Sequence, residues 1–246
     1  MHSTNPAAAV LARSAGQINF GGVAAGATMS GTTSKALLYC ALTVLVGYWA
    51  MTYSLGYIIA NLALPKALMF GSLIAGVVLA FVTLFNPKVA PITAPIYAVL
   101  EGAALGSVSA AFELKYPGIV STAVLSTFAV VMAMLVLWKF RLIVPTARFR
   151  AVVTGALTGI VLLYIANLIF SLFGSQLLPS SGPVSIGISL IICTVAALSL
   201  VLDFDTIEQS VEAGLPKYFE AFNAFSLLIT ICWLYVEILN LLSKRE

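Results

Sequence analysis

The chain has 246 residues, of which 61% are hydrophobic and only 9% are charged, whereas an ordinary soluble domain carries about 25% charged residues. This composition excludes a conventional soluble domain and indicates an integral membrane protein. The formal net charge of +3 is small and its carriers are scattered, so nucleic acid is not expected as a partner.

The residue types that build metal centres and disulfides are scarce. The one histidine, His2, stands at the N-terminus, which argues against a histidine-built zinc site and a Ser-His hydrolase. The cysteines Cys40, Cys193 and Cys232 all lie in apolar tracts, where buried free thiols are the simpler interpretation. We therefore expect no cofactor, no metal site and no enzymatic activity.

The predicted organisation is a tail followed by one membrane domain. Residues 1–35 are rich in Gly, Ala, Ser and Thr and are expected to form a flexible tail. In residues 36–246, uncharged tracts recur that reach the roughly 20 residues needed to cross a bilayer. Seven membrane-spanning helices are predicted from these tracts and from the turn signals between them: 36–65, 67–87, 92–114, 118–138, two within 151–202 divided by a turn at 174–183, and 221–242. A polar connection, 203–220, is expected before the last helix.

The positions of Lys and Arg predict the orientation, because cytoplasmic loops retain them. With the N-terminus inside, most of the basic residues fall on the cytoplasmic side. Four of these residues cluster between the fourth and fifth predicted helices: Lys139, Arg141, Arg148 and Arg150. We therefore expect a cytoplasmic N-terminus.

Four carboxylates are expected at membrane depth: Glu101, Asp203, Asp205 and Glu237. An ionised group near the bilayer centre costs a few kcal/mol or more, so it usually faces the bundle interior or a water cavity. Glu101 is the deepest, and it is either a hydrogen-bonded structural residue or a gate, relay or ion ligand. Glu237 precedes the terminal Lys244 and Arg245 by two turns at most, which favours a helix-end carboxylate beside a basic terminus.

Two aspartates follow the sixth predicted helix. Residues two apart on a helix point in nearly opposite directions, so Asp203 and Asp205 do not share a face. Asp203 lies on a stripe with Ala196 and Ser199, and this favours Asp203 for the interior. For either aspartate, the alternative is a carboxylate at the interface, solvated or paired with a nearby base.

Two G-x-x-x-G pairs indicate close packing of helices, because missing side chains let two backbones approach. They are Gly102 with Gly106, and Gly155 with Gly159. We expect both pairs to pack within the monomer, and a dimer interface is the alternative.

Three segments carry a resemblance to a known family. They are NPKVAPITAPIYAVLEGAALG at 86–106, YPGIVSTAVLSTFAVVM at 116–132 and LVLDFDTIEQSVEAGLPKYFEAF at 200–222. Together they resemble the Bax inhibitor-1 superfamily, the transmembrane Bax inhibitor motif proteins, and in particular their bacterial membrane branch. The similarity covers residues 36–246.

The resemblance implies an all-α fold in which six helices surround a central seventh. It also implies a pH-sensitive calcium leak channel, in which an aspartate on the sixth helix and one on the seventh share a proton. The family's Asp-Thr pair matches Asp205-Thr206, which assigns the sensor to Asp205 rather than to Asp203. The second family aspartate has no counterpart, because Thr230 stands near its position. The candidate substitutes are Glu101, Glu237 and Asp203.

The expected partners and location follow from this resemblance. We expect the bacterial inner (plasma) membrane, with the lipid bilayer and calcium ions as partners. The alternative is a non-conducting interaction protein that restrains a membrane protease or a quality-control complex. An intramembrane aspartyl protease is disfavoured, because it needs two facing aspartates and the predicted last helix contains none.

Overall fold

Seven helices make up the membrane domain in the computed structural model, which describes residues 26–61, 63–174, 177, 179 and 182–245. The predicted tail therefore lies largely outside the described residues, as does His2. The helices are α2 (Met29–Asn61), α3 (Lys66–Phe85), α4 (Ala90–Lys115), α5 (Ile119–Lys139), α6 (Ala147–Leu172), α7 (Pro183–Glu212) and α8 (Tyr218–Ser243), with a short 3-10 turn η1 (Pro87–Val89) before α4. In the described part of the chain, all seven are long and apolar enough to cross a membrane. The prediction of an all-α protein with seven spans is confirmed.

Two helix boundaries differ from those predicted. Helix α2 begins at Met29, within the segment assigned to the tail. Helix α7 continues to Glu212, so Asp203 and Asp205 lie inside a helix and not in a polar connection. The reason is that charge alone does not end a helix. The first residue after Leu202 that breaks the helix is Gly214, which has a φ of 61° that favours glycine.

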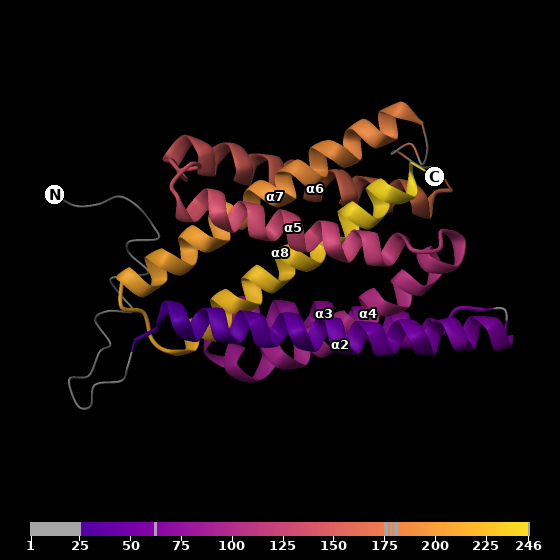
Figure 1. Ribbon diagram of the computed structural model, residues 1–246, viewed down its shortest axis with the longest axis horizontal. Helices are drawn as coiled ribbons and strands as arrows, with labels where there is room; N and C mark the ends of the chain where they lie inside the picture. Colours follow the sequence, from indigo (N-terminus) through magenta and orange to yellow (C-terminus); the bar gives the residue numbers. More distant parts are fainter. Residues whose placement is uncertain (1–25, 62, 175–176, 178, 180–181, 246) are drawn as a thin grey trace.

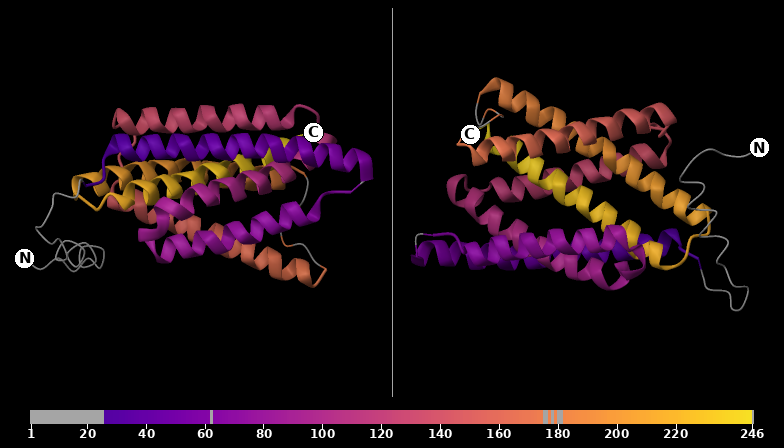
Figure 2. Two further views of the ribbon diagram at one scale, coloured as in Figure 1. Left: turned by 90° about the horizontal axis from the view of Figure 1, so that it is seen from below. Right: turned by 180° about the vertical axis from the view of Figure 1, so that it is seen from behind.

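Helix α8 crosses the middle of the bundle, with α5, α6 and α7 on one side and α2, α3 and α4 on the other (Figures 1 and 2). It packs directly against α2, α4, α5 and α7, while α3 packs on α4 and α6 packs on α7. The core where α7 and α8 meet contains the fully buried Leu200 and Phe225. Tyr97 of α4 packs edge-on against Phe225, with ring centroids 4.9 Å apart.

Glycines bring α2 and α4 into backbone contact. A Cβ added to Gly102 would lie 2.6 Å from the Thr43 carbonyl oxygen, and one added to Gly106 would overlap the Gly47 carbonyl. Packing within the monomer is therefore confirmed for this pair. For Gly155 and Gly159 on α6 it is wrong, because a Cβ there would meet no atom of the described residues within 4 Å.

The bundle has two distinct ends. At the N-terminal end, on the left of Figure 1, α2 and α8 begin and α7 ends. At the C-terminal end, on the right, α8 ends and α7 begins. Asp203 and Asp205 lie in the half of α7 nearer the N-terminal end, whereas Glu237 lies in the half of α8 nearer the C-terminal end.

Candidate functional site

Asp205 forms an ion pair across two helices. The guanidinium of Arg150, in the first turn of α6, donates to Asp205 Oδ2. Gln209, one turn further along α7, donates to the same oxygen at 2.7 Å. Asp205 is 6% exposed, while Arg150 is partly exposed and also donates to the Pro145 carbonyl at 3.2 Å. The pair therefore ties the beginning of α6 to α7, with the carboxylate buried and the base open to the surroundings.

A second ion pair lies one turn further towards the N-terminal end. Arg141, in the loop between α5 and α6, donates to both carboxylate oxygens of Glu208, at 2.8 and 3.0 Å. Both side chains are more exposed than Asp205. This bidentate pair, together with the Asp205 pair, holds the α5–α6 connection against the last turns of α7.

Asp203 points away from Asp205, towards α8. Its Oδ1 accepts a hydrogen bond from Ser226 at 3.3 Å. Its Oδ2 is buried, and no described residue donates a hydrogen bond to it. The hydroxyl of Thr230, one turn after Ser226, interacts with the same carboxyl group. Asp203, Ser226 and Thr230 therefore form a polar cluster between α7 and α8, which we call the Asp203 cluster.

Glu237 lies closer to the C-terminal end and is 3% exposed. Its Oε1 accepts hydrogen bonds from Trp233 Nε1, at 3.0 Å, and from the Tyr164 hydroxyl of α6. Lys244 acts on it electrostatically but donates its hydrogen bond to Ser189 at 2.7 Å. Glu237 therefore joins α6 to α8 and has the expected basic neighbour.

Glu101 is half-buried between α3 and α4. Tyr97, one turn earlier, is its hydrogen-bond partner, and a Cβ added to Gly76 of α3 would lie 3.8 Å from its Oε2. In the described part of the chain, no hydrogen bond or ion pair joins Glu101 or Glu237 to either aspartate. The structure thus brings Asp203 and Thr230 together and holds the two glutamates elsewhere.

Two candidate site residues are not indicated by any local sequence pattern. The basic cluster that contains Arg150 predicts only the orientation, yet Arg150 is the base that pairs with Asp205. Glu220 lies in the predicted polar connection, yet it is 2% exposed. It accepts from Thr28 N and Oγ1, at 3.0 and 2.9 Å, and from the Lys35 ammonium. No local spacing could have found this contact, because Thr28 and Glu220 are 192 residues apart.

The chemistry available to these groups is proton exchange and loose cation contact. Among the described residues, no group of three or more His, Cys, Asp or Glu side chains could hold a metal ion. Calcium requires six to eight oxygen ligands when it is tightly held. One carboxyl with two hydroxyls, as in the Asp203 cluster, offers fewer oxygen atoms than calcium requires, and it can gain or lose a proton.

Comparison with known proteins identifies one family. The model of the family described as Bax inhibitor 1 like matches residues 4–246. No curated protein and no solved structure matches the chain. The match includes all seven helices and both aspartates of α7.

Proposed function

Because the chain belongs to the Bax inhibitor 1 like family, we propose that this integral membrane protein is a cation leak pathway, with calcium as its first candidate ion and protonation of the α7 carboxylates as its control. In this proposal the chain is not an enzyme. Its partners are the lipid bilayer and the ion that passes.

The observation that carries the proposal is the buried carboxyl of Asp203, whose hydrogen-bonding neighbours are the Ser226 and Thr230 hydroxyls and which forms no ion pair within the described residues. A buried carboxylate without a counter-charge is costly when the group is ionised, so this carboxyl favours either a proton or a nearby cation. Protonation of Asp203 and binding of a cation beside it would both affect the contact between α7 and α8, because Asp203 of α7 interacts with Ser226 and Thr230 of α8. A change of protonation there would change how the two central helices pack.

The Asp205–Arg150 pair adds a second control point at the N-terminal end. Protonation of Asp205 would remove the attraction to Arg150 and release the start of α6 from α7. Because Arg150 is partly exposed, releasing it into water costs less than breaking a fully buried pair. The pair therefore suits a latch that opens reversibly.

The direct test is calcium entry into liposomes that contain the purified full-length chain. We expect flux above that of empty vesicles and a dependence on pH between about 6 and 8, which Asp203→Asn and Asp205→Asn each change. Glu212→Gln, an exposed site on the same helix, is the matched control and should behave as wild type. Flux equal to that of empty vesicles across this pH range would refute the leak.

For orientation, we propose a plasma membrane of bacterial type with the N-terminus in the cytoplasm. The support is the set of basic residues at the N-terminal end, which includes Lys139, Arg141, Arg148 and Arg150. Labelling single cysteines from outside intact cells would test it. A cysteine replacing Lys115, at the C-terminal end, should react with an impermeant reagent, and one replacing Arg148 should not.

A second candidate function is a membrane interaction protein that restrains a protease or quality-control complex. The open face of α6 favours it, because a Cβ added to Gly155 or Gly159 would meet no atom of the described residues within 4 Å and small residues suit a close helix partner. Crosslinking from a photoreactive residue at position 155 would test this. A partner present at one-to-one stoichiometry supports the candidate, and crosslinks to lipid alone refute it.

A further inference from the structure

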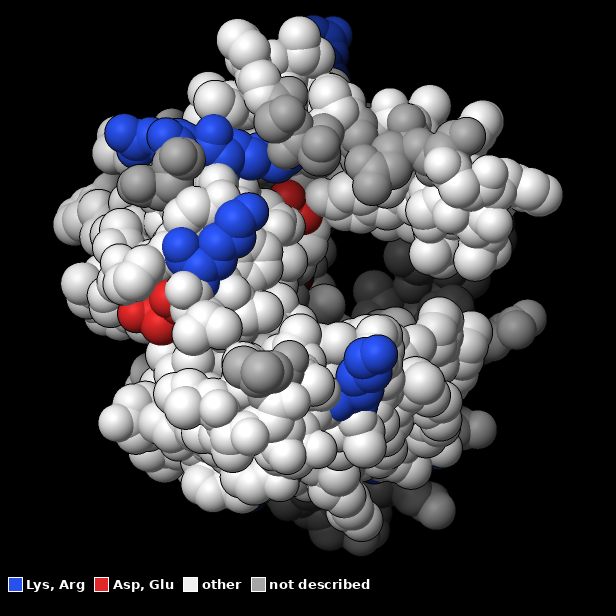
Figure 3. All heavy atoms as spheres, turned by 90° about the vertical axis from the view of Figure 1, so that its right-hand side faces the viewer, with Lys and Arg blue, Asp and Glu red and all other residues white. Residues whose placement is uncertain are grey.

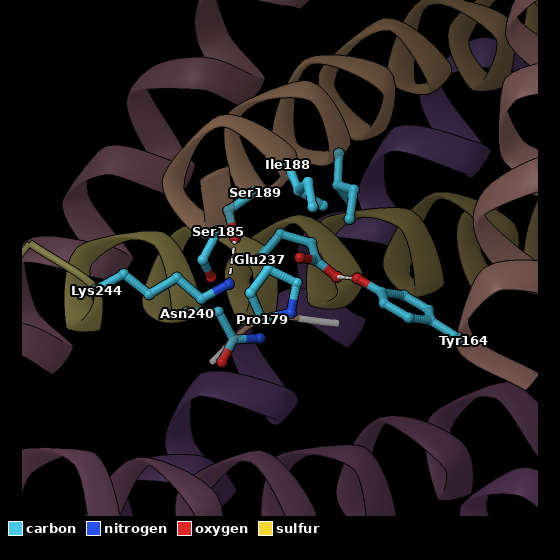
Figure 4. A pocket seen from close by; sticks show the side chains of 9 residues that line it. Tyr164, Pro179, Ser185, Ile188, Ser189, Glu237, Asn240 and Lys244 are labelled. Carbon is cyan, nitrogen blue, oxygen red and sulfur yellow. Dashed lines mark hydrogen bonds between the residues drawn. The ribbon is translucent and has the colours of Figure 1, made fainter. Parts of the chain in front are cut away.

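A cavity of about 200 Å³ lies between α6, α7 and α8 at the C-terminal end. Its polar lining comes from Tyr164, Ser185, Ser189, Glu237, Asn240 and Lys244 (Figure 4). The share of liquid volume of one water is about 30 Å³, so the cavity has room for a group of several non-hydrogen atoms. The same end of the molecule is visibly hollowed, with basic atoms at the rim of the hollow (Figure 3).

One side of this cavity is suited to an anionic group. Ser185 is 1% exposed, and its hydroxyl has no hydrogen-bond partner among the described residues. Figure 4 shows this hydroxyl facing the same space as the Lys244 ammonium. Ser185 also stands in the first turn of α7, where no described side chain caps the helix. Uncapped N–H groups and the helix dipole attract negative charge.

The other side is suited to a cationic donor. Both donors to Glu237, Tyr164 and Trp233, use its Oε1. No hydrogen bond from the part of the chain that the structure describes reaches its Oε2. An ammonium group in the cavity would find this oxygen free. A quaternary ammonium would not, because it carries no N–H.

Glu237 and Lys244 together set the net charge that the cavity accepts. They form no direct ion pair, since the ion pairs within the described residues involve other side chains. A lone anion would face the Glu237 carboxylate, and a lone cation would face the Lys244 ammonium. A net-neutral ligand with both charges satisfies both groups without leaving a buried charge unpaired.

We infer that this cavity binds a small zwitterion. Its primary ammonium would be held by Glu237, and its anionic oxygens by Lys244, Ser185 and the α7 N-terminus. Such a group could come from an ethanolamine phospholipid, since Ser185 and Lys244 stand at helix ends where headgroups lie, or from a soluble phosphodiester that carries a primary amine. The two sources share the same chemistry at the site.

The test is the thermal unfolding midpoint of the detergent-purified full-length chain with four added probes. These are short-chain phosphatidylethanolamine, free glycerophosphoethanolamine, and phosphatidylcholine and phosphatidylglycerol with the same acyl chains. We expect the midpoint to rise with the ethanolamine probes and not with the other two. A rise with the ethanolamine lipid alone identifies the headgroup as the ligand, and a rise with both identifies a soluble zwitterion as an equal source.

Variants localise the binding. Lys244→Met and Glu237→Gln should each weaken the apparent affinity about tenfold or more, the effect of losing one charged hydrogen bond. Lys115→Met, at the same end of the bundle but outside the cavity, is the matched control and should not change the affinity.

Three outcomes would each overturn the inference: equal shifts with phosphatidylglycerol or phosphatidylcholine, no shift with any probe, or an unchanged affinity in Lys244→Met. Lys244 lies beyond the last turn of α8, so its variant remains informative if Glu237→Gln fails to fold.

Discussion

Thr230 of α8 lies beside Asp203 of α7, and Asp205 faces the opposite way, into the Arg150 guanidinium. The position at which the resemblance implies a second aspartate therefore lies next to Asp203, the aspartate that helical periodicity assigns to the interior. The aspartate that the family motif favoured has a base as its partner. The two aspartates of α7 therefore lie on opposite sides of the helix and do not form a carboxylate pair.

Restoring a carboxylate at position 230 would create a close acidic pair with Asp203. Two charges about 4 Å apart repel by about 4 kcal/mol at an effective dielectric near 20. Thr230→Asp should therefore lower the thermal midpoint at neutral and alkaline pH, with recovery as the pH falls and one group gains a proton. Asp203→Asn in the same chain should abolish the loss. A midpoint that is insensitive to pH in Thr230→Asp would show that the two side chains do not meet.

Removing Arg150 should leave a buried carboxylate without its partner. Breaking a buried pair costs about 3–5 kcal/mol. Because Arg150 is partly exposed, we expect Arg150→Ala to lower the free energy of unfolding by less, about 2–3 kcal/mol. The free energy of unfolding in mixed micelles measures this. Arg148→Ala, which is exposed on the same helix turn, should change it little. Adding Asp205→Asn to Arg150→Ala should recover much of the loss, and purely additive effects would contradict the pairing.

The glycine contact between α2 and α4 predicts a contrast with α6. A Cβ at position 106 overlaps the Gly47 carbonyl, so Gly106→Ala must push two backbones apart and should cost about 1–3 kcal/mol, as overpacking does. Gly155→Ala meets nothing within 4 Å in the described structure and should be neutral or stabilising by up to about 1 kcal/mol. Equal losses in the two variants would mean that α6 packs against a partner helix.

Glu220 should hold the start of α2 in place. Glu220→Ala removes the acceptor for the Thr28 N–H and for the Lys35 ammonium, so we expect faster hydrogen exchange in the first turns of α2 and a loss of about 1–3 kcal/mol. Glu220→Gln keeps an acceptor for Thr28 and should have a smaller effect. Glu212→Gln, exposed on α7, is the control. Unchanged exchange at residues 28–35 in Glu220→Ala would contradict this role.

The sequence predicted some parts of the candidate site and missed others. Helical periodicity placed Asp203 and Asp205 on opposite sides of one helix, because the angle between successive residues is a local property of the backbone. The predicted end of that helix, Leu202, is too early. Charged residues suggested a loop there, but no helix-breaking residue stands before Gly214. No sequence pattern indicated the contacts of Arg150 and Glu220, because their partners are 55 and 192 residues away.

The amino-acid sequence alone determined that this chain has seven helices able to cross a membrane and which carboxylates stand in or beside their apolar tracts. Transfer into lipid depends on the summed hydropathy of about 20 consecutive residues, and that sum is local. Only the tertiary structure decided which partners each carboxylate has: Arg150 for Asp205, Ser226 and Thr230 for Asp203, and Tyr164 for Glu237. These pairings depend on the rotation and depth at which whole helices pack, and packing is set by contacts between residues far apart in the chain.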